Sequence, residues 1–263
     1  MADTSTTPEH LDTRGVLQVR DGDGVRLITL DRPEALNAFN QKLWCATAEA
    51  IADAAGDPAI GCVVLTGNGR AFTAGQDLGE MADTSAFEDG EEPGYRQLMA
   101  VLETFPKPLV AAVNGVGVGI GLTILPHCDV VFMSETARLK APFCSLGVTT
   151  EASASLMLPV TIGWQEAAHL LFTEPWVDAA EALRIGLAWK VCPPDELLAT
   201  AMDEARAIGR MPVTSLVATK SLMLAARGDA VTAARAREEA EFARLVGAPE
   251  NLAALEAFFA PKS

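Results

Sequence analysis

The chain has 263 residues, of which 49% are hydrophobic, and a formal net charge of -15 at pH 7. This length suits one large α/β domain, with or without a small appendage, and permits a sizeable buried core. The negative charge argues against nucleic acid and anionic membranes as partners. No apolar run reaches the roughly 20 residues of a membrane-spanning helix, so no span is expected.

Residues 1–13 lack a basic segment followed by an apolar one, so they are predicted to form a flexible tail and no secretion signal. Five scattered cysteines without a C-x-x-C pair are typical of reduced core thiols. The last residues do not match the S-K-L peroxisomal signal, and the expected location is therefore cytoplasmic. The histidines, His10, His127 and His169, are expected to have structural roles, and no metal site is expected.

The first elements in chain order predict a sheet with parallel strands. Residues 16–30 contain two β-prone runs around a DGDG turn, which indicates a hairpin. Asn37 or Asn40 can cap a helix over 39–54, and residues 62–66, CVVLT, form a short buried strand. Strand, helix and strand in this order imply a right-handed crossover and a largely parallel sheet.

Two loops that contain glycine follow predicted strands. The first is GNGRAFTAGQDL at 67–78, and the second begins after the strand 109–113 with glycines at 115, 117, 119 and 121. Open α/β sheets bind ligands at the carboxyl ends of their strands. The second loop does not match the dinucleotide-binding pattern G-x-G-x-x-G, since Leu122 replaces the third glycine. A tightly packed corner without a ligand is the alternative.

The second half of the chain is mostly helical. The acidic residues 81–94 are interpreted as a mobile flap beside the site or as a solvated surface loop. A capping pattern at Asp178 and a stop at Gly186 predict a short helix, and Val191 lies in a predicted edge strand. Amphipathic helices are predicted over 195–209, 215–227, 230–246 and 251–259. They are expected to add little to the first core and to contact a neighbouring subunit, or else to form a cap on a monomer.

Four segments together resemble the enoyl-CoA hydratase/isomerase family, also called the crotonase superfamily: RAFTAGQDL at 70–78, PLVAAVNGVGVGIG at 108–121, and the segments 127–151 and 178–191. The resemblance implies an α/β spiral of ββα repeats over 14–194 and a helical C-terminal region, 195–263, that mediates trimerisation. It also implies an acyl-CoA thioester as substrate and a homotrimer or a dimer of trimers. No cofactor is expected, because coenzyme A is part of the substrate.

The chemistry shared by that family is stabilisation of a thioester enolate by two backbone N–H groups, which the resemblance assigns to Ala74 and Ile120. Both loops follow strands, so their N–H groups can converge where negative charge develops. Many relatives have Gly where Ile120 stands, but a group that acts through its backbone tolerates this difference. The resemblance implies that the substrate contacts Ala74, Gly75, Gln76, Asp77, Leu78, Ile120, Phe143 and Lys262.

The acid–base residues separate the branches of the family. Hydratases carry two glutamates, and the matching positions here are Thr123 and Phe143. Adding water requires one group to activate water and one to protonate carbon, so a hydratase is disfavoured. The segment PFCSLGVTTE resembles the Δ3,Δ2-enoyl-CoA isomerase branch, whose single glutamate corresponds to Glu151. A pKa raised by apolar neighbours would suit Glu151 as the base, and a helix-capping role is the alternative.

Other functions stay open at this point. They are an enoyl-CoA hydratase or a thioester hydrolase with the same oxyanion site, and a non-catalytic acyl-CoA-binding protein. The resemblance places the adenosine end of coenzyme A near the C-terminal helices. Cations and aromatic rings suited to it are Lys220, Phe258, Phe259 and Lys262, with Arg32 and Lys42 as alternatives for the phosphates.

Overall fold

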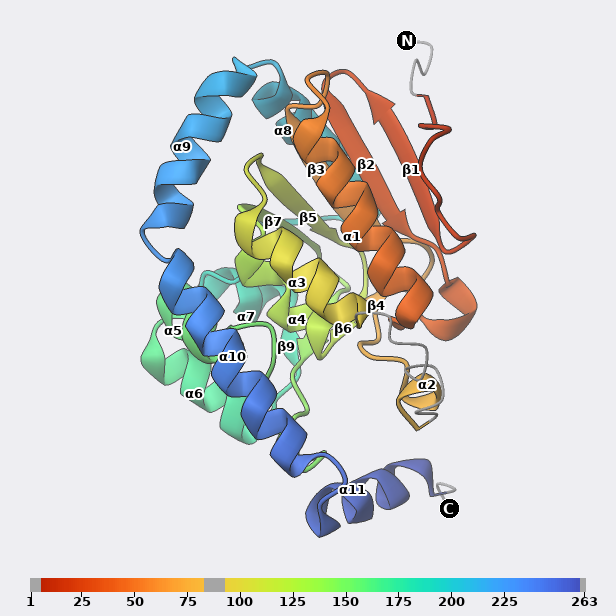
Figure 1. The fold of residues 1–263 in the computed structure, drawn as a ribbon, viewed down its shortest axis with the longest axis vertical. Helices are drawn as coiled ribbons and strands as arrows, with labels where there is room; N and C mark the ends of the chain where they lie inside the picture. Colours follow the sequence, from red (N-terminus) through yellow and green to blue (C-terminus); the bar gives the residue numbers. More distant parts are fainter. Residues whose placement is uncertain (1–5, 83–92, 261–263) are drawn as a thin grey trace.

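The computed structural model describes residues 6–82 and 93–260, without the side chains at 81, 82, 258 and 259. Its largest element is a six-stranded sheet in the order β1-β2-β3-β5-β7-β10 (Figure 1). Strand β1 is antiparallel to β2, and every later neighbour is parallel. The predicted hairpin and strands are confirmed by β1 (Leu17–Gly22), β2 (Val25–Leu30), β3 (Cys62–Gly67), β5 (Leu109–Val113) and β10 (Lys190–Cys192). Strand β7 (Val130–Ser134), between β5 and β10, was not predicted.

A second, four-stranded sheet has the order β4-β6-β8-β9. Each of β3, β5 and β7 is followed in the chain by a strand of this smaller sheet and then by helix, which repeats a ββα unit along the chain. The predicted α/β spiral of ββα repeats is therefore confirmed. The strands are β4 (Ala71–Thr73), β6 (Val116–Val118), β8 (Arg138–Lys140) and β9 (Val177–Asp178).

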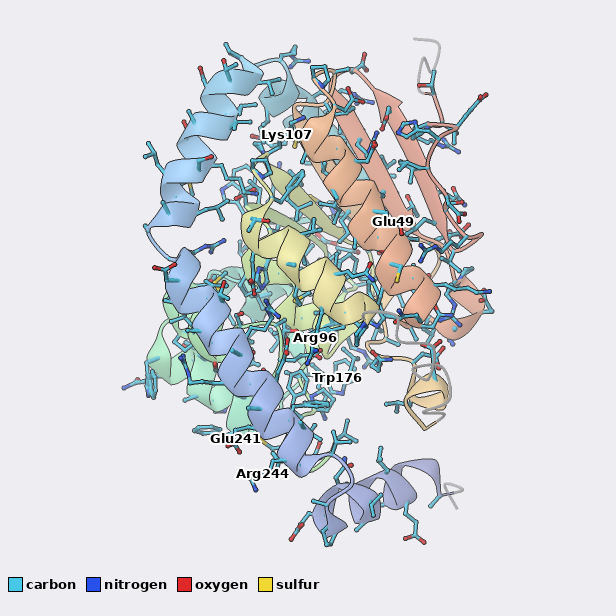
Figure 2. The ribbon with its side chains drawn as sticks, viewed as in Figure 1. Glu49, Arg96, Lys107, Trp176, Glu241 and Arg244 are labelled. Carbon is cyan, nitrogen blue, oxygen red and sulfur yellow. The ribbon has the colours of Figure 1, made fainter. Side chains whose placement is uncertain are left out.

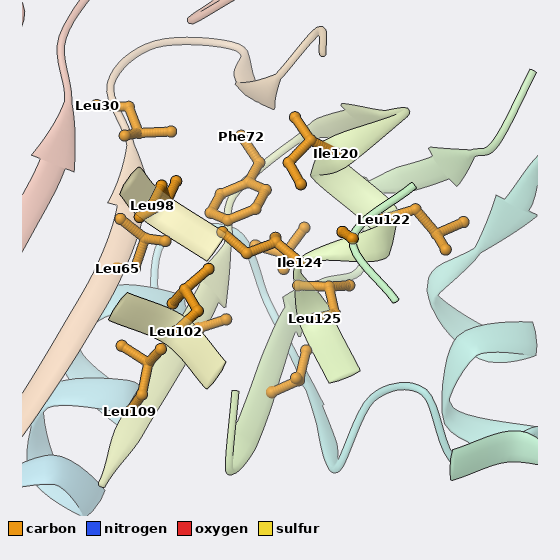
Figure 3. Packing of buried hydrophobic residues seen from close by; sticks show 14 of the residues in the cluster. Leu30, Leu65, Phe72, Leu98, Leu102, Leu109, Ile120, Leu122, Ile124 and Leu125 are labelled. Atoms are coloured by element: carbon orange, nitrogen blue, oxygen red, sulfur yellow. The ribbon is translucent and has the colours of Figure 1, made fainter. Parts of the chain in front are cut away.

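One face of the large sheet is covered by α1 (Gln41–Gly56) and α3 (Gly94–Thr104), which lie side by side in Figure 1. The side chain of Asn40 caps α1, because its Oδ1 accepts the Leu43 N–H at 3.0 Å. Figure 3 shows the main core under these helices, where Leu65 of β3 and Leu98 of α3 gather with Phe72. This core joins both sheets to the helical layer.

The opposite face of the large sheet is covered by α8 (Leu197–Gly209). Successive strand residues point to opposite faces, so Val63 and Leu65 belong to the main core while Val64 lies in a second apolar cluster. Ala201 and Ala205 of α8 complete that second cluster. In line with the prediction for the first core, α8 contributes no residue to the main core cluster, but it builds a second core on the other face of the sheet, which was not predicted.

The described part of the predicted N-terminal tail is attached to the sheet. Thr6 and Asp21 exchange two backbone hydrogen bonds of 2.8 and 2.7 Å, and the His10 ring lies 3.0 Å from an Asp53 carboxylate oxygen. Residues 6–13 are therefore attached to the rest of the fold at Thr6 and His10, and residues 1–5 lie outside the described residues.

Of the remaining helices, those that were predicted from Asp178 onward lie close to their predicted positions. The Asp178 carboxylate caps α7 by accepting the Glu181 N–H at 2.8 Å, and Gly186, with φ +81°, follows that helix. Among the described residues, no helix is long and apolar enough to cross a lipid bilayer. The helices are α5 (Ala154–Ile162), α6 (Trp164–Thr173), α7 (Ala179–Arg184), α9 (Val213–Ala225), α10 (Gly228–Leu245) and α11 (Pro249–Phe259).

Lys220 ties α9 to the large sheet. Its Nζ donates hydrogen bonds of 2.7 Å to the Lys107 carbonyl and to Asp129 Oδ2, and the side chain is almost fully buried. The same Asp129 oxygen accepts the N–H of Leu109, the first residue of β5. Lys220 is therefore a structural cation, and the prediction that it binds the phosphates of coenzyme A is wrong.

Replacing Lys220 by methionine should lower the free energy of unfolding by about 3–5 kcal/mol, because Asp129 would remain partly buried without its counter-charge. Urea denaturation of the purified variant measures this loss. The matched control is Arg244→Gln, which breaks the exposed pair with Glu241 and should cost about 0–1 kcal/mol. Equal losses in the two variants would contradict the structural role of Lys220.

Candidate active site

A cavity of about 570 Å³ lies where the loops after the smaller sheet meet α3, α10 and α11. The α2 segment (Leu78–Ala82) and α11, which stand opposite each other in Figure 1, both contribute lining residues. Most of the wall is apolar or aromatic, which is typical of a pocket for a hydrophobic group. Side chains that form it include Trp44, Tyr95, Phe143, Leu146, Val148 and Phe242.

Most of the predicted substrate-contacting residues line this cavity, namely Ala74, Gly75, Gln76, Leu78, Phe143 and the candidate base Glu151. Asp77 does not, and its carboxylate accepts hydrogen bonds of 3.1 and 3.2 Å from the Arg32 guanidinium. The predicted binding role of Asp77 is therefore replaced by a structural ion pair, which also occupies Arg32. Lys262 lies outside the described residues.

The amide of Ala74 is not free to bind an oxyanion, because its N–H donates to the Leu36 carbonyl at 2.9 Å. An amide that is already bonded inside the fold would have to break that bond before it could stabilise a ligand. The prediction of Ala74 as the first oxyanion donor is therefore wrong, although Ala74 does line the cavity.

The N–H of Gln76 is free instead. Phe39 bonds to the residues on either side of it: the Phe39 N–H donates to Gly75 O at 2.7 Å, and the Phe39 carbonyl accepts the Asp77 N–H at 2.9 Å. In extended backbone, successive N–H groups point in opposite directions, so the Gln76 N–H points away from Phe39. It has no acceptor among the residues that the structure describes. The sequence alone did not indicate that the Gln76 N–H is free, because the bonds to its neighbours come from Phe39, which lies far away in the sequence.

The second predicted donor, Ile120, is the first residue of α4 (Ile120–Thr123). Its N–H has no acceptor in the described part of the chain, and the residue is fully buried next to Gly119, which lines the cavity. Gly75 has φ +96°, and a Cβ on it would lie only 2.9 Å from the Val118 carbonyl. Glycine thus lets the two loops lie against each other, which brings the Gln76 and Ile120 amides to the same side of the cavity.

Glu151 is the candidate base. One side of its carboxyl group faces the cavity, so the residue is only partly buried by surface area, but protein atoms surround its other sides. Burial raises the pKa of Glu151 to about 7, and the negative charge of Glu238 contributes to the rise. Its carboxylate has no hydrogen-bond partner among the described residues. These properties suit a group that takes and returns a proton near neutral pH.

The alternative role of Glu151 as a helix cap is wrong. Helix α5 begins only at Ala154, and Glu151 contributes its backbone carbonyl, which accepts the Ala154 N–H at 3.0 Å. The two residues between them, Ala152 and Ser153, have φ values of +59° and +58°. This left-handed conformation costs about 1–2 kcal/mol per residue for non-glycine residues. We call residues 150–155 the base loop.

Two side chains from other elements bind the backbone of Ala152 in the base loop. The hydroxyl oxygen of Tyr95, on α3, accepts the Ala152 N–H at 2.9 Å. The His127 ring donates from Nε2 to the Ala152 carbonyl at 2.8 Å, and burial lowers the pKa of His127, so the ring is neutral. The predicted structural role of His127 is therefore confirmed, and it supports the loop that carries Glu151.

The positions of the two hydratase glutamates carry no acid. Thr123 is fully buried, with its hydroxyl 3.3 Å from the Gly119 carbonyl, and Phe143 presents a ring to the cavity.

Sequence analysis missed other carboxylates that line the cavity. They include Glu238 and Glu239 of α10. Arg96, labelled in Figure 2, reaches from α3 toward Glu239, which it contacts at 3.1 Å. No local pattern marks these residues, because α10 approaches the site only in the folded chain.

Comparison with known proteins identifies the family. The chain matches the family described as enoyl-CoA hydratase/isomerase over residues 20–259. A probable enoyl-CoA hydratase of Mycobacterium tuberculosis is 37% identical over 191 residues, which cover 73% of this chain and 74% of that protein. A 1,2-epoxyphenylacetyl-CoA isomerase of Escherichia coli is 33% identical over 201 residues, covering 73% and 76%.

Solved structures agree with these sequence relatives. The crystal structure of an enoyl-CoA hydratase/isomerase from Pseudoalteromonas atlantica superposes with a TM-score of 0.88 at 34% identity, covering 94% of this chain and 99% of that one. Its similarity extends over both sheets and the helices that surround the cavity, since it spans almost the whole chain. The chain therefore belongs to the enoyl-CoA hydratase/isomerase family, the crotonase superfamily.

Proposed function

We propose that this protein is a Δ3,Δ2-enoyl-CoA isomerase, which moves a double bond in an acyl-CoA thioester. The observation that carries the proposal is that Glu151, with an unbonded carboxylate, and Gln76, with an unbonded amide, line one cavity, while the unbonded amide of Ile120 directly follows Gly119, which lines it too. An isomerisation needs only one acid–base group, and the absence of acids at Thr123 and Phe143 is consistent with it.

In the proposed reaction, the Glu151 carboxylate removes a proton from C2 of a 3-enoyl-CoA. The electron pair of the broken C–H bond moves into conjugation with the thioester, and the negative charge of the resulting dienolate rests on its oxygen. The N–H groups of Gln76 and Ile120 donate to that oxygen, which is worth several kcal/mol in a site with little water. The Glu151 carboxyl group then returns the proton at C4, which gives the 2-enoyl-CoA and regenerates the carboxylate.

An enoyl-CoA hydratase is the second candidate. It is supported by relatives that are named hydratases and by the hydroxyl of Thr150, which lines the cavity, is buried and has no partner among the described residues. This hydroxyl and Glu151 could together hold a water molecule. Against it, the other carboxylate next to Glu151 is that of Glu238, whose two oxygens already accept backbone N–H groups.

The deciding experiment supplies 3-enoyl-CoA and 2-enoyl-CoA esters of several chain lengths to the purified protein. Formation of the conjugated 2-enoyl thioester, followed by its ultraviolet absorption, supports the isomerase. Formation of a 3-hydroxyacyl-CoA from the 2-enoyl ester identifies a hydratase, and release of free coenzyme A identifies a thioester hydrolase. Binding without any product would show a non-catalytic acyl-CoA-binding protein.

We further propose that the protein assembles as a homotrimer or a dimer of trimers. The support is a set of large apolar side chains on the second half of the chain that remain exposed in the single subunit, an arrangement that favours burial against another copy. Light scattering at micromolar concentration measures the mass, and a monomer would contradict the proposal. The set includes Val160, Trp164, Phe172, Trp189, Leu222 and Met223.

A further inference from the structure

Glu238 connects α10 to the base loop. Its Oε2 accepts the Ser153 N–H at 2.7 Å and its Oε1 accepts the Ser155 N–H at 2.8 Å, so both carboxylate oxygens are used. The residue is 5% exposed, yet it lines the same cavity as Glu151. A carboxylate is thus buried next to the candidate base without an ion pair to Arg or Lys among the described residues. Burial raises the pKa of Glu238, while its hydrogen bonds with Ser155 and Ser153 and the charge of Arg237 lower it.

These two hydrogen bonds replace the usual cap at the start of α5. The N-cap residue Ser153 makes no capping bond with its own side chain, and its hydroxyl instead donates to the Val231 carbonyl of α10 at 3.0 Å. A carboxylate that accepts N–H groups at a helix N-terminus makes strong, charge-assisted bonds. These bonds offset the free-energy cost of the left-handed backbone at Ala152 and Ser153. Because these two residues directly follow Glu151, their conformation fixes the position of the Glu151 side chain.

Glu238 also acts on Glu151 through its charge. The other titratable groups that act on the base loop or on Glu238 are the Tyr95 hydroxyl on α3, the neutral His127 ring and two residues of α10. The charge of Arg237 favours ionised Glu238, and Glu239 is paired with Arg235 and Arg96. Burial keeps Tyr95 neutral by raising its pKa, and the charge of Glu151 adds to that rise. Glu238 is therefore the charged neighbour that opposes ionisation of Glu151.

We propose that Glu238 is a positioning residue of the active site, which holds the base loop in place and sets the pH range in which Glu151 works. The inference rests on the proposed role of Glu151 as the base. It assigns a part in the reaction to α10, although Glu238 itself does not exchange a proton with the substrate.

The test compares two variants that separate position from charge. Glu238→Gln keeps one acceptor oxygen and removes the charge, so kcat should fall about tenfold with KM nearly unchanged. The acid limb of its kcat profile should shift to lower pH by roughly half to one unit. Glu238→Asp keeps the charge but withdraws it from the two amides, so kcat should fall without that shift. The control is Glu241→Gln, an exposed residue of the same helix.

Amide hydrogen exchange is the second measurement, and it does not depend on activity. The Ser153 and Ser155 amides should exchange at least about tenfold faster in Glu238→Gln than in Glu241→Gln, because one of their acceptors is lost. Unchanged exchange together with an unchanged pH profile would overturn the proposal. If the wild type proved inactive on 3-enoyl-CoA, the proposed function alone would fail, and exchange would still decide whether Glu238 holds the loop.

Discussion

Glu151→Gln should lower kcat for 3-enoyl-CoA by about 10³- to 10⁴-fold, because glutamine cannot accept the C2 proton. The dissociation constant of an unreactive acyl-CoA should stay within about twofold, since the carboxylate acts on the reacting carbon and not on the coenzyme A part. Stopped-flow kinetics and titration calorimetry measure the two quantities. A variant that keeps most of its activity would assign the base to another group.

The raised pKa of Glu151 also predicts how the activity and the stability of the wild type depend on pH. With a pKa of about 7, Glu151 must be ionised to act, so kcat should rise with pH through a half-maximal value at about pH 7 and level off roughly one pH unit higher. Stability should follow the opposite course. Because folding raises this pKa, the contribution of Glu151 to stability is full below pH 4.5 and is lost as the pH rises through about 7. Glu151→Gln should therefore gain stability, on the order of 2 kcal/mol, at pH 8.

Gln76→Pro should lower kcat about 10²- to 10³-fold, because proline removes the N–H that we assign to the oxyanion site. The fold has no other use for this N–H, since Phe39 bonds to the Gly75 carbonyl and the Asp77 N–H, and both remain. Steady-state kinetics measure the loss, and circular dichroism checks the fold.

The matched variant is Gln76→Ala, which keeps the backbone N–H but loses the side-chain oxygen that accepts from Trp44 Nε1 at 3.0 Å. Its loss in kcat should be at least tenfold smaller than that of Gln76→Pro. Equal losses in both variants would show that the side chain of Gln76, and not its amide, supports the reaction.

The parts of the fold that could be predicted are those that local patterns determine. The strand at 109–113 is a short apolar run between proline and glycine, and Asp178 precedes Glu181 at capping distance, so both were predicted close to their observed bounds. The side of the sheet that α8 covers depends on alternate residues of five strands, and no segment of sequence carries that information alone.

The candidate site likewise contains parts that local patterns predict and parts that depend on contacts between distant segments. The glycine loops and Glu151 stand in recognisable segments, and the structure places them at one cavity. The donor in the first loop was assigned wrongly, because Leu36 occupies the Ala74 amide through a contact between segments about 40 residues apart. Glu238 was missed for a related reason, since it lies 85 residues from Ser153 and on a helix whose charges suggested only a solvated face.

The bond between Glu238 and Ser153 also orders events during synthesis of the chain. A ribosome delivers the base loop well before α10, so the strained turn at Ala152 and Ser153 first emerges without the carboxylate that holds it. Contacts this distant in sequence form late in folding. A nascent chain that already contains both glycine loops and Glu151 therefore lacks the carboxylate that we propose holds its base loop until α10 has left the exit tunnel.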